Sequence, residues 1–381
     1  MAMRLLVSGA GDLGFRILRK LLQGQRLAGA VPSDIVCETQ TSKRHASLLS
    51  LGFEGRLASD PPLRTPSLLI CFPPSETYVA DVQRALDQWD GTGPALLVSS
   101  IGVFSENVAG PVDERSPVDE TSAIVHEEAL ALARGAHVLR LAGLYDRASG
   151  PHIHWQRQGE VAGAADGVIN LLHRHDAADV CARMLSSSLA PRLWVVSDGS
   201  PLTRTEIVEA WALLTGEKPP TFRLADGEPS GMRVHPKQLF EALEWRPRWT
   251  SFLDFVDSLD KPRNVLGSPL KGCCLRPMTG YFRDGFCRTV DEDQGTHIVC
   301  IEATEDFLRF SKEHGNDLST SRSELNFPGL KGGDRWCLCA SRWLEALHAG
   351  VAPRLYLEST HDRMLEWVEL EVLKDFGLDL A

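Results

Sequence analysis

A glycine-rich motif near the N-terminus constrains the fold more than any other feature of this sequence. The motif SGAGDLG places Gly9, Gly11 and Gly14 in G-x-G-x-x-G spacing, between an apolar run, RLLV, and an amphipathic pattern, FRILRKLL. This order predicts a strand, a tight turn and a helix that begins near Asp12 and Leu13. In such a unit the glycines permit the turn, the approach of a pyrophosphate and close packing of the helix on the sheet. We therefore predict a nucleotide site at these five residues.

Further apolar runs alternate with helical patterns across the first two-thirds of the chain. They are SDIVCET, SLLICFP, PALLVSS, HVLRLAG and RLWVVSD. Buried strands that alternate with helices are typical of a parallel sheet with helical crossovers. After the last strand, TRTEIVEAWALL begins with Thr203 and Glu206 in the spacing of a capping box. We predict an α/β fold with a Rossmann-type, doubly wound parallel sheet and a small C-terminal lobe.

The character of the sequence changes near residue 260. The segment LDKPRNVLGSPL is rich in Pro, Gly and Asn, and the remainder is rich in Cys and Trp without the strand–helix alternation. A chain of 381 residues is also longer than a typical single domain. We predict a nucleotide-binding domain over residues 1–258 and a separate small α+β domain over residues 259–381.

Charge and cysteine content exclude several classes of partner. A net charge of −11 disfavours nucleic acid, and no apolar run approaches the ~20 residues that span a membrane. The N-terminus enters the first strand at once, which leaves no room for a signal peptide. We therefore expect a cytoplasmic protein, a small-molecule substrate and nine reduced cysteines. No pattern specifies an oligomeric state.

The end of the second strand bears on the choice between NAD and NADP. Glu38 is placed to accept hydrogen bonds from the ribose hydroxyls of NAD. The residues that follow include Ser42 and Lys43, which suit the 2′-phosphate of NADP. A solvated helix start explains the same residues equally well, so the cofactor prediction is NADP or NAD, with a weak preference for NADP.

Several segments together resemble a known family. SGAGDLG, LLICFPPSE, SSIGVFSENVAGPVDERSP, VLRLAGLYD and INLLHRHDAADV make residues 3–258 similar to an atypical extended short-chain dehydrogenase/reductase of the NAD-dependent epimerase/dehydratase superfamily. The resemblance implies a Rossmann fold with the cofactor beside Phe72, Pro73 and Ser99. It also implies a substrate held between the carboxyl edge of the sheet and the small lobe.

The family's catalytic tyrosine and lysine are missing. Ser100 takes the place of the family's serine, but none of the four tyrosines is followed by Lys four residues later. Val125 or a neighbour occupies the tyrosine place, in the segment DETSAIVHEEAL. His126 is the nearest substitute acid in this segment, although a single His on such a helix is more often solvated.

The C-terminal third resembles a second family, called domain of unknown function 2237. The segments NVLGSPLKGCC, PMTGYFRDGFC, DQGTHIVCIEAT and FPGLKGGDRWCLCASRWLEALHAGVAP carry this resemblance. The family name implies no activity. His297, Cys300, Cys337 and Cys339 offer four ligands for a tetrahedral zinc, but the spacing is unusual, and buried cysteines that pack as small hydrophobic residues are the stronger interpretation.

Polar residues near these cysteines suggest another kind of site. Arg335, Trp336, Arg342 and His361 suit an anionic or planar ligand, because a guanidinium group binds carboxylates or phosphates. Turns and caps in a loop-rich domain account for such residues equally well.

Three functions are consistent with the sequence. The first is an NAD(P)-dependent oxidoreductase or epimerase-like enzyme that acts on a small molecule, with a sugar derivative as one candidate. The second is a catalytically silent or redox-sensing nucleotide-binding protein that regulates its C-terminal domain. The third places the chemistry in the C-terminal domain alone, through Cys300 or through Cys337 and Cys339.

Overall fold

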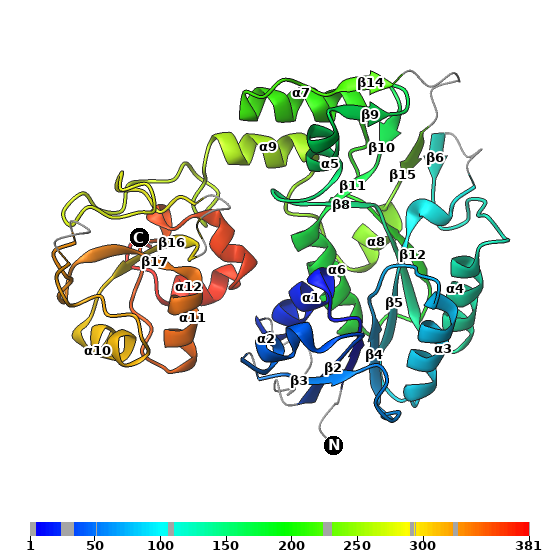
Figure 1. Cartoon of the computed structure of the whole chain (residues 1–381), viewed down its shortest axis with the longest axis horizontal. Helices are drawn as coiled ribbons and strands as arrows, with labels where there is room; N and C mark the ends of the chain where they lie inside the picture. The colour runs from blue at the N-terminus through cyan, green and yellow to red at the C-terminus, as the bar shows by residue number, and fades with distance from the viewer. Residues whose placement is uncertain are drawn as a thin grey trace. The chain divides into compact units, whose positions relative to one another are not determined.

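The computed structural model describes residues 5–23, 34–50, 52–105, 110–223, 231–289, 293, 295–322 and 327–380. The chain divides into two compact units, Met1–Val256 and Asp257–Ala381, shown in Figure 1. We call them the N-terminal and the C-terminal domain and describe each by itself. Within the described ranges, no helix has both the length and the apolar character needed to cross a membrane.

A seven-stranded parallel sheet forms the centre of the N-terminal domain. Its order is β12-β7-β5-β4-β1-β2-β3, and each neighbouring pair is parallel. The strands are β1 (Leu5–Ser8), β2 (Ile35–Thr39), β3 (Glu54–Leu57), β4 (Ser67–Ile70), β5 (Ala95–Ser100), β7 (His137–Leu141) and β12 (Leu193–Val196). This order confirms the predicted doubly wound sheet. The strand order reverses beside β1 and β4, and such a point is where ligands bind in this class of fold.

Helices cover both faces of this sheet, as the side chains of β1 require. Leu5 and Val7 join one buried cluster, whereas Leu6 joins another on the opposite face, because successive residues of a strand point to opposite sides. On one face lie α1 (Asp12–Gln23), α2 (His45–Ser50) and α6 (Arg174–Leu185). On the other lie α3 (Tyr78–Gln88) and α4 (Ala123–Ala133). A sheet buried on both faces is a rigid base for a site at its edge.

A small lobe extends from the carboxyl edge of the sheet. Its paired strands are β6 (Gly110–Val112) with β15 (Met232–Val234), β8 (Gly143–Tyr145) with β11 (Leu171–His173), β9 (Glu160–Ala162) with β14 (Thr221–Arg223), and β10 (Val168–Ile169) with β13 (Leu202–Thr203). Its helices are α5 (Pro151–Gln158) and α7 (Arg204–Thr215), followed by α9 (Phe252–Asp260), which crosses the boundary between the two domains. Helix α8 (Lys237–Ala242) instead packs against β12 in the core of the sheet. The predicted capping box is confirmed, since the Thr203 side chain accepts from the Glu206 amide and Glu206 accepts from the Thr203 amide.

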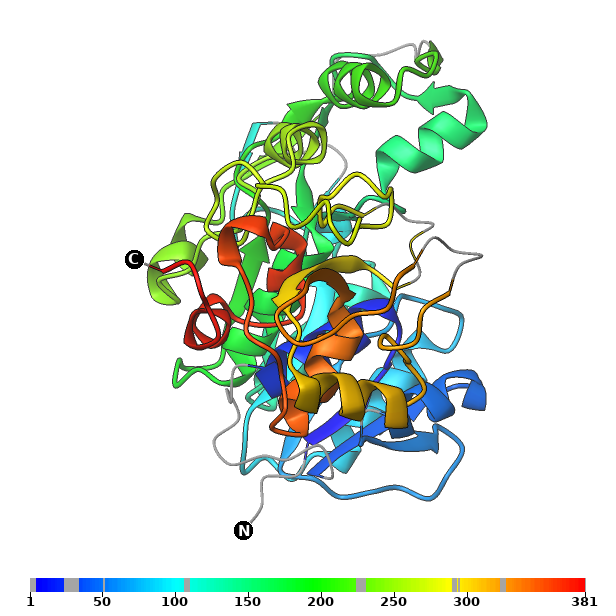
Figure 2. The ribbon, with the colours of Figure 1, turned by 90° about the vertical axis from the view of Figure 1, so that its left-hand side faces the viewer.

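The C-terminal domain is built around an antiparallel pair of strands. These are β16 (His297–Glu302) and β17 (Arg335–Cys339), and α10 (Glu305–Glu313), α11 (Ala340–His348) and α12 (Leu370–Asp375) accompany them. Helices α10 and α11 of this domain lie side by side (Figure 2). Trp343 of α11 is completely buried in the core, where the apolar side of the pair packs. The small α+β domain that the sequence predicted is therefore present.

Two disulfides correct the expectation of reduced cysteines. Cys273 is bonded to Cys300, and Cys287 is bonded to Cys337. The four sulfurs form one buried cluster against Tyr356. Loops before β16 bring the first cysteine of each pair to the strands, and sequence spacing alone does not reveal such pairings.

Candidate functional site

The glycine-rich loop lies at the point where the strand order reverses. Gly9 has φ +99°, and a Cβ there would lie 2.4 Å from the Cys71 carbonyl oxygen at the end of β4. A Cβ on Gly14 would lie 2.5 Å from the carbonyl oxygen of Gly9. A Cβ on Gly11, in contrast, would have no atom within 4 Å. The first and third glycines are therefore required by the fold, whereas the second leaves open space above the backbone, as a pyrophosphate requires.

The N-terminus of α1 opens onto a cavity of about 500 Å³. Asp12 at this helix start accepts bonds from Arg16 at 3.2 Å and from Arg174 at 3.1 Å, and Arg174 also lines the cavity. Backbone amides at a helix start and nearby guanidinium groups both favour an anion. The other lining residues are Gly11, Leu13, Cys71, Phe72, Pro73, Pro74, Tyr78, Val98, Ser99, Ser100, Ile124, Leu141, Ala142, Gly143 and Leu144.

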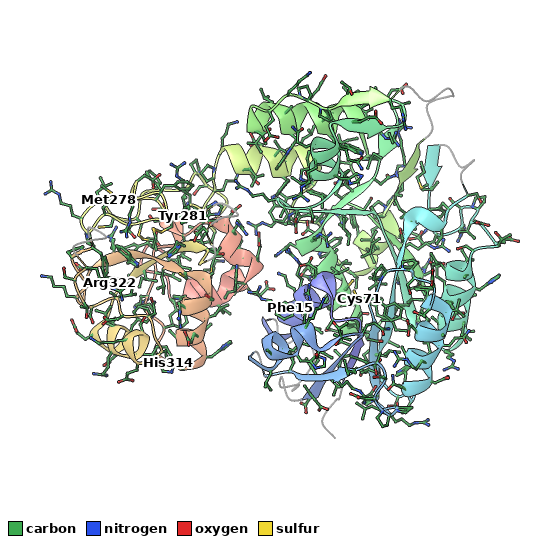
Figure 3. The ribbon with its side chains drawn as sticks, viewed as in Figure 1. Phe15, Cys71, Met278, Tyr281, His314 and Arg322 are labelled. Atoms are coloured by element: carbon green, nitrogen blue, oxygen red, sulfur yellow. A yellow bond between two sulfur atoms is a disulfide. The ribbon has the colours of Figure 1, made fainter. Side chains whose placement is uncertain are left out.

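A second cavity of about 310 Å³ adjoins the first. Phe72 and Pro73 line both cavities, so the two form one crevice along the carboxyl ends of β1, β2 and β4. The remaining lining residues are Ser8, Gly9, Glu38, Thr39, Gln40, Ala58, Ser75, Thr77, Asp81 and Arg84. Figure 3 labels Cys71, which follows β4 and lines the larger cavity. An elongated ligand with two ends suits this shape.

Glu38 lines the smaller cavity, but its carboxylate is already bound by the protein. It is buried and accepts a hydrogen bond from Arg84 at 2.7 Å, while Arg56 lies 3.7 Å from its second oxygen. Ser8 donates a further bond to Glu38 at 3.3 Å. The structure therefore surrounds the predicted ribose acceptor with two cations, and one of them, Arg84, also lies 3.8 Å from Asp81.

The cation that reaches the smaller cavity is Arg84, and it differs from the cation that the sequence predicted. Ser42 and Lys43 belong to an exposed 3₁₀ turn, Ser42–Arg44, and neither is among the cavity-lining residues. Arg84 of α3 lines the cavity instead. Its position follows from the packing of α3 next to β4, and no local motif marks it.

The two serines at the end of β5 have different environments. Ser99 donates a hydrogen bond to Glu128 of α4 at 2.5 Å, and Arg140 of β7 binds the same buried carboxylate through Nε and Nη2 at 2.6–3.1 Å. Ser100 is exposed in the larger cavity, where its hydroxyl accepts a bond from the Gly102 amide at 3.1 Å. Ser100 is therefore available to a ligand, whereas Ser99 is part of a buried ion-pair network.

The segment around Val125, which takes the place of the family's tyrosine, supplies no acidic side chain to the cavity that Ser100 lines. Ile124 lines this cavity, whereas His126 is exposed on α4 and lies outside the lining residues. The structure gives no support to His126 as a substitute acid. Tyr78 of α3 does line the cavity, but burial, followed by the charges of Glu128 and Glu127, raises its pKa to about 12. Its hydroxyl can donate a hydrogen bond but gives up its proton only with difficulty.

The zinc set proposed from the sequence is corrected by the disulfides. Cys300 and Cys337 are each bonded to another cysteine, so their thiolates are not available to a metal. His297 and Cys339 are left together, as partners in the register between β16 and β17. Cys339 is a free, partly exposed cysteine.

The four residues of the C-terminal domain that were predicted to bind an anionic or planar ligand contact different neighbours. The Arg335 guanidinium lies 3.6 Å from the ring centroid of Tyr356. Trp336 is buried, and its ring lies 5.1 Å from that of Phe327. The last two are Arg342, which binds Glu345 at 2.8 Å, and His361, whose Nδ1 accepts from the Arg363 amide at 3.1 Å.

Comparison with solved structures defines the class of the N-terminal domain. It has the fold of the NAD-dependent epimerases and dehydratases. The similar structures include dTDP-glucose 4,6-dehydratase from Bacillus anthracis in complex with NAD (14% identity, 68% of this chain and 97% of that chain, TM-score 0.55). UDP-glucose 4-epimerase from Thermotoga maritima with UDP-glucose is also similar (15% identity, 68% and 99%, TM-score 0.54). A conserved protein of unknown function from Silicibacter pomeroyi matches at 22% identity (68% and 98%, TM-score 0.53).

The C-terminal domain matches a family model. Residues 263–377 match DUF2237, described as an uncharacterized protein conserved in bacteria. Both resemblances identified in the sequence are thus confirmed. No curated protein matches the chain.

Proposed function

We propose that the N-terminal domain binds a nicotinamide dinucleotide. The observation that carries this proposal is the open space above Gly11, between two glycines that the fold itself requires. Gly11 and the N-terminus of α1 would hold the pyrophosphate, and the two cavities would receive the two ends of the cofactor. The nicotinamide, when bound, supplies a site that accepts or donates hydride.

The charges around Glu38 favour NADP over NAD. An NAD-binding carboxylate must be free to accept from the ribose, but Glu38 is already bonded to Arg84 and faces Arg56. The guanidinium group of Arg84 is partly exposed and lines the cavity, so it suits a 2′-phosphate. We therefore expect both forms to bind, with the phosphorylated form binding more tightly.

The proposed reaction class is that of an oxidoreductase or epimerase-like enzyme with a small-molecule substrate. Ser100 is its candidate catalytic group, because its hydroxyl is exposed in the larger cavity. A silent nucleotide-binding protein is the second candidate, and one observation favours it. Glu128 and Arg140 form a buried ion pair behind Ser99, and Glu128 belongs to the segment in which the family that the sequence resembles carries its tyrosine and lysine. Such a pair cannot pass a proton, since arginine stays charged.

The test is a titration of the full-length chain with NADPH and NADH, followed by nicotinamide fluorescence. Gly11→Asp places a carboxylate in the open space without meeting protein atoms at Cβ. We expect this variant to fold and to lose on the order of a hundredfold in affinity for both cofactors, because like charges repel. Arg84→Gln should weaken NADPH about tenfold without weakening NADH, because the change frees Glu38 to accept from the ribose.

Two results would count against the proposal. If neither cofactor binds the wild-type chain, the domain is a scaffold. If Gly11→Asp binds as tightly as wild type, the cofactor does not lie at the glycine loop. The two candidate functions are separated by mixing the loaded protein with nucleotide sugars and following both the reduced-nicotinamide absorbance and the sugar by NMR. Loss of absorbance or conversion of the sugar supports an enzyme, and no change in either supports a silent binding protein.

A further inference from the structure

Three side chains of the C-terminal domain form a hydrogen-bonded series that the nucleotide site does not use. The buried carboxylate of Asp293 lies 2.7 Å from Nδ1 of His297. Its other oxygen accepts from the His297 amide at 2.8 Å and from the Thr289 hydroxyl at 2.9 Å. Three contacts fix the carboxylate, so the carboxylate in turn fixes the orientation of the imidazole.

Cys339 lies beside this imidazole. His297 and Cys339 are partners in the register of β16 and β17, and a Cβ on Gly295 would lie 2.7 Å from both Cys339 Sγ and His297 Cε1. The glycine therefore leaves room for the thiol to meet the ring. The hydrogen bond to Cys339 is the largest cause that raises the pKa of His297 to about 9, and Asp293 adds to it against the opposing effect of burial.

The position of Cys339 at the start of a helix supplies backbone donors next to its sulfur. Cys339 is the N-cap residue of α11, a nine-residue helix, and its side chain makes no capping hydrogen bond. The N-cap side chain lies next to the amides of the first turn, which have no partner within a helix. These amides can receive an oxyanion that forms beside the Cys339 sulfur.

We propose that Cys339, His297 and Asp293 form a nucleophilic site for acyl transfer. The Cys339 thiolate attacks the carbonyl carbon of an ester or thioester, and an S–C bond forms. The bond to the leaving group breaks, its electron pair stays on the leaving oxygen or sulfur, and the His297 imidazolium donates a proton to that atom. Water then attacks the acyl group while His297 takes a proton from it, and the S–C bond breaks to restore thiolate and imidazolium. Asp293 is a positioning residue that keeps the imidazole in place.

Aromatic side chains near Cys339, His297 and Asp293, which we call the triad, indicate the acyl group that this site binds. The ring of Tyr281 lies 6.4 Å from that of His297, and Phe282 packs edge-on against Tyr281. Both are exposed, by 40% and 44%, and Figure 3 labels Tyr281 in the loops of this domain. Exposed aromatic rings beside a polar centre bind apolar and planar groups. The substrate class is therefore an ester or thioester with an apolar or aromatic acyl group.

The chain contains its own control for the nucleophile. Cys274 is also free and partly exposed, but its thiol donates to the Arg276 carbonyl oxygen at 3.1 Å. The full-length chain is treated with iodoacetamide at pH 6 without reductant, where an ordinary thiol with a pKa of about 8.5 is almost entirely protonated. Peptide mass spectrometry should find Cys339 alkylated on the order of ten times faster than Cys274. His297→Asn should remove this advantage, and Asp293→Asn should reduce it.

The acyl step is tested with p-nitrophenyl acetate. Wild type and Cys274→Ser should release a burst of one nitrophenolate per chain and carry the acetyl group on Cys339, whereas Cys339→Ser should show no burst. Equal alkylation of the two cysteines at pH 6 in wild type, which requires no variant, would overturn the proposal. A burst that persists in Cys339→Ser would also overturn it. The titration with NADPH should be unchanged in Cys339→Ser, so this inference and the nucleotide proposal succeed or fail separately.

Discussion

The two domains hold a buried carboxylate by different means. In the N-terminal domain, Glu128 is bound by Arg140, and both side chains are almost completely buried. In the C-terminal domain, Asp293 is bound by His297, whose side chain is 36% exposed. An arginine keeps its proton, whereas a histidine gains and loses one near neutral pH. The first pair therefore only stabilises the fold, whereas the second can take part in proton transfer.

The difference follows from the size of each core. The N-terminal sheet is covered on both faces, so it can enclose a charged pair completely. In its described residues, the C-terminal domain has one two-stranded sheet and two disulfides, and it buries Asp293 while His297 remains partly exposed. Small domains often depend on such crosslinks, because a small core contributes little stability.

Reduction of the disulfides should give the largest difference between the domains. Loss of each bridge is expected to cost the C-terminal domain about 2–5 kcal/mol, since the crosslinks restrict its unfolded state. Cys37, Cys71 and Cys181 of the N-terminal domain are free and buried, so this domain should not respond. Hydrogen exchange of peptides from each domain, with and without dithiothreitol, measures the change in stability of both domains. Equal protection of the C-terminal peptides in the two conditions would show that the bridges do not stabilise this domain.

Arg140→Met tests the buried pair of the N-terminal domain. The change leaves the Glu128 carboxylate buried without its cation, and we expect a loss of about 3–5 kcal/mol in the free energy of unfolding. The matched control is Arg134→Met, because Arg134 and Asp87 form an exposed pair at 2.7 Å that should contribute about 0–1 kcal/mol. Urea unfolding followed by peptide hydrogen exchange gives both values. Similar losses in the two variants would contradict the role assigned to Arg140.

For the seven-stranded sheet, the sequence predicted the buried strands and missed β3, which is only partly buried. The central strands are apolar runs, but β3 reads EGRL and lies at the edge of the sheet, where its residues are mostly half-buried. Only pairing with β2 makes it a strand. An edge strand needs little apolar surface, so hydrophobicity alone does not reveal it.

The glycine loop and cavity residues such as Glu38, Phe72 and Ser100 were predicted from the sequence, but Arg84 and the pairing of His297 with Cys339 opposite each other were not. Gly9, Gly11 and Gly14 are set by local backbone geometry, which a short motif records. Arg84 reaches Glu38 through the packing of α3, and Cys339 reaches His297 through the register of two strands. Contacts between distant segments leave no local pattern, so they appear only once the chain is folded.

The stability of the C-terminal domain should fall as the pH rises from about 6.5 to 9. His297 has a folded-state pKa of about 9, above its ordinary value of 6.5. Its contribution is therefore complete below pH 6.5 and is lost as the pH passes through 9. Because more than a third of the side chain is exposed, we expect a loss of about 1 kcal/mol. His297→Asn should make the unfolding free energy of this domain independent of pH in this range, and a decline that persists in the variant would assign the effect to another group.

The smallest expected difference concerns the helix caps of the two domains. Thr203 caps α7 within a complete capping box, whereas the Thr304 hydroxyl accepts one bond, from the Phe307 amide at 3.2 Å, at the start of α10. Thr203→Ala should cost about 1 kcal/mol and Thr304→Ala about 0.5 kcal/mol. Ser122→Ala is the control, because Ser122 begins α4 without a side-chain capping bond and its loss should have almost no effect. Urea unfolding resolved by domain measures all three. If Thr304→Ala proves more costly than Thr203→Ala, the smaller domain depends on local hydrogen bonds more strongly than its disulfides suggest, and the contrast between the domains would then rest on the buried ion pair alone.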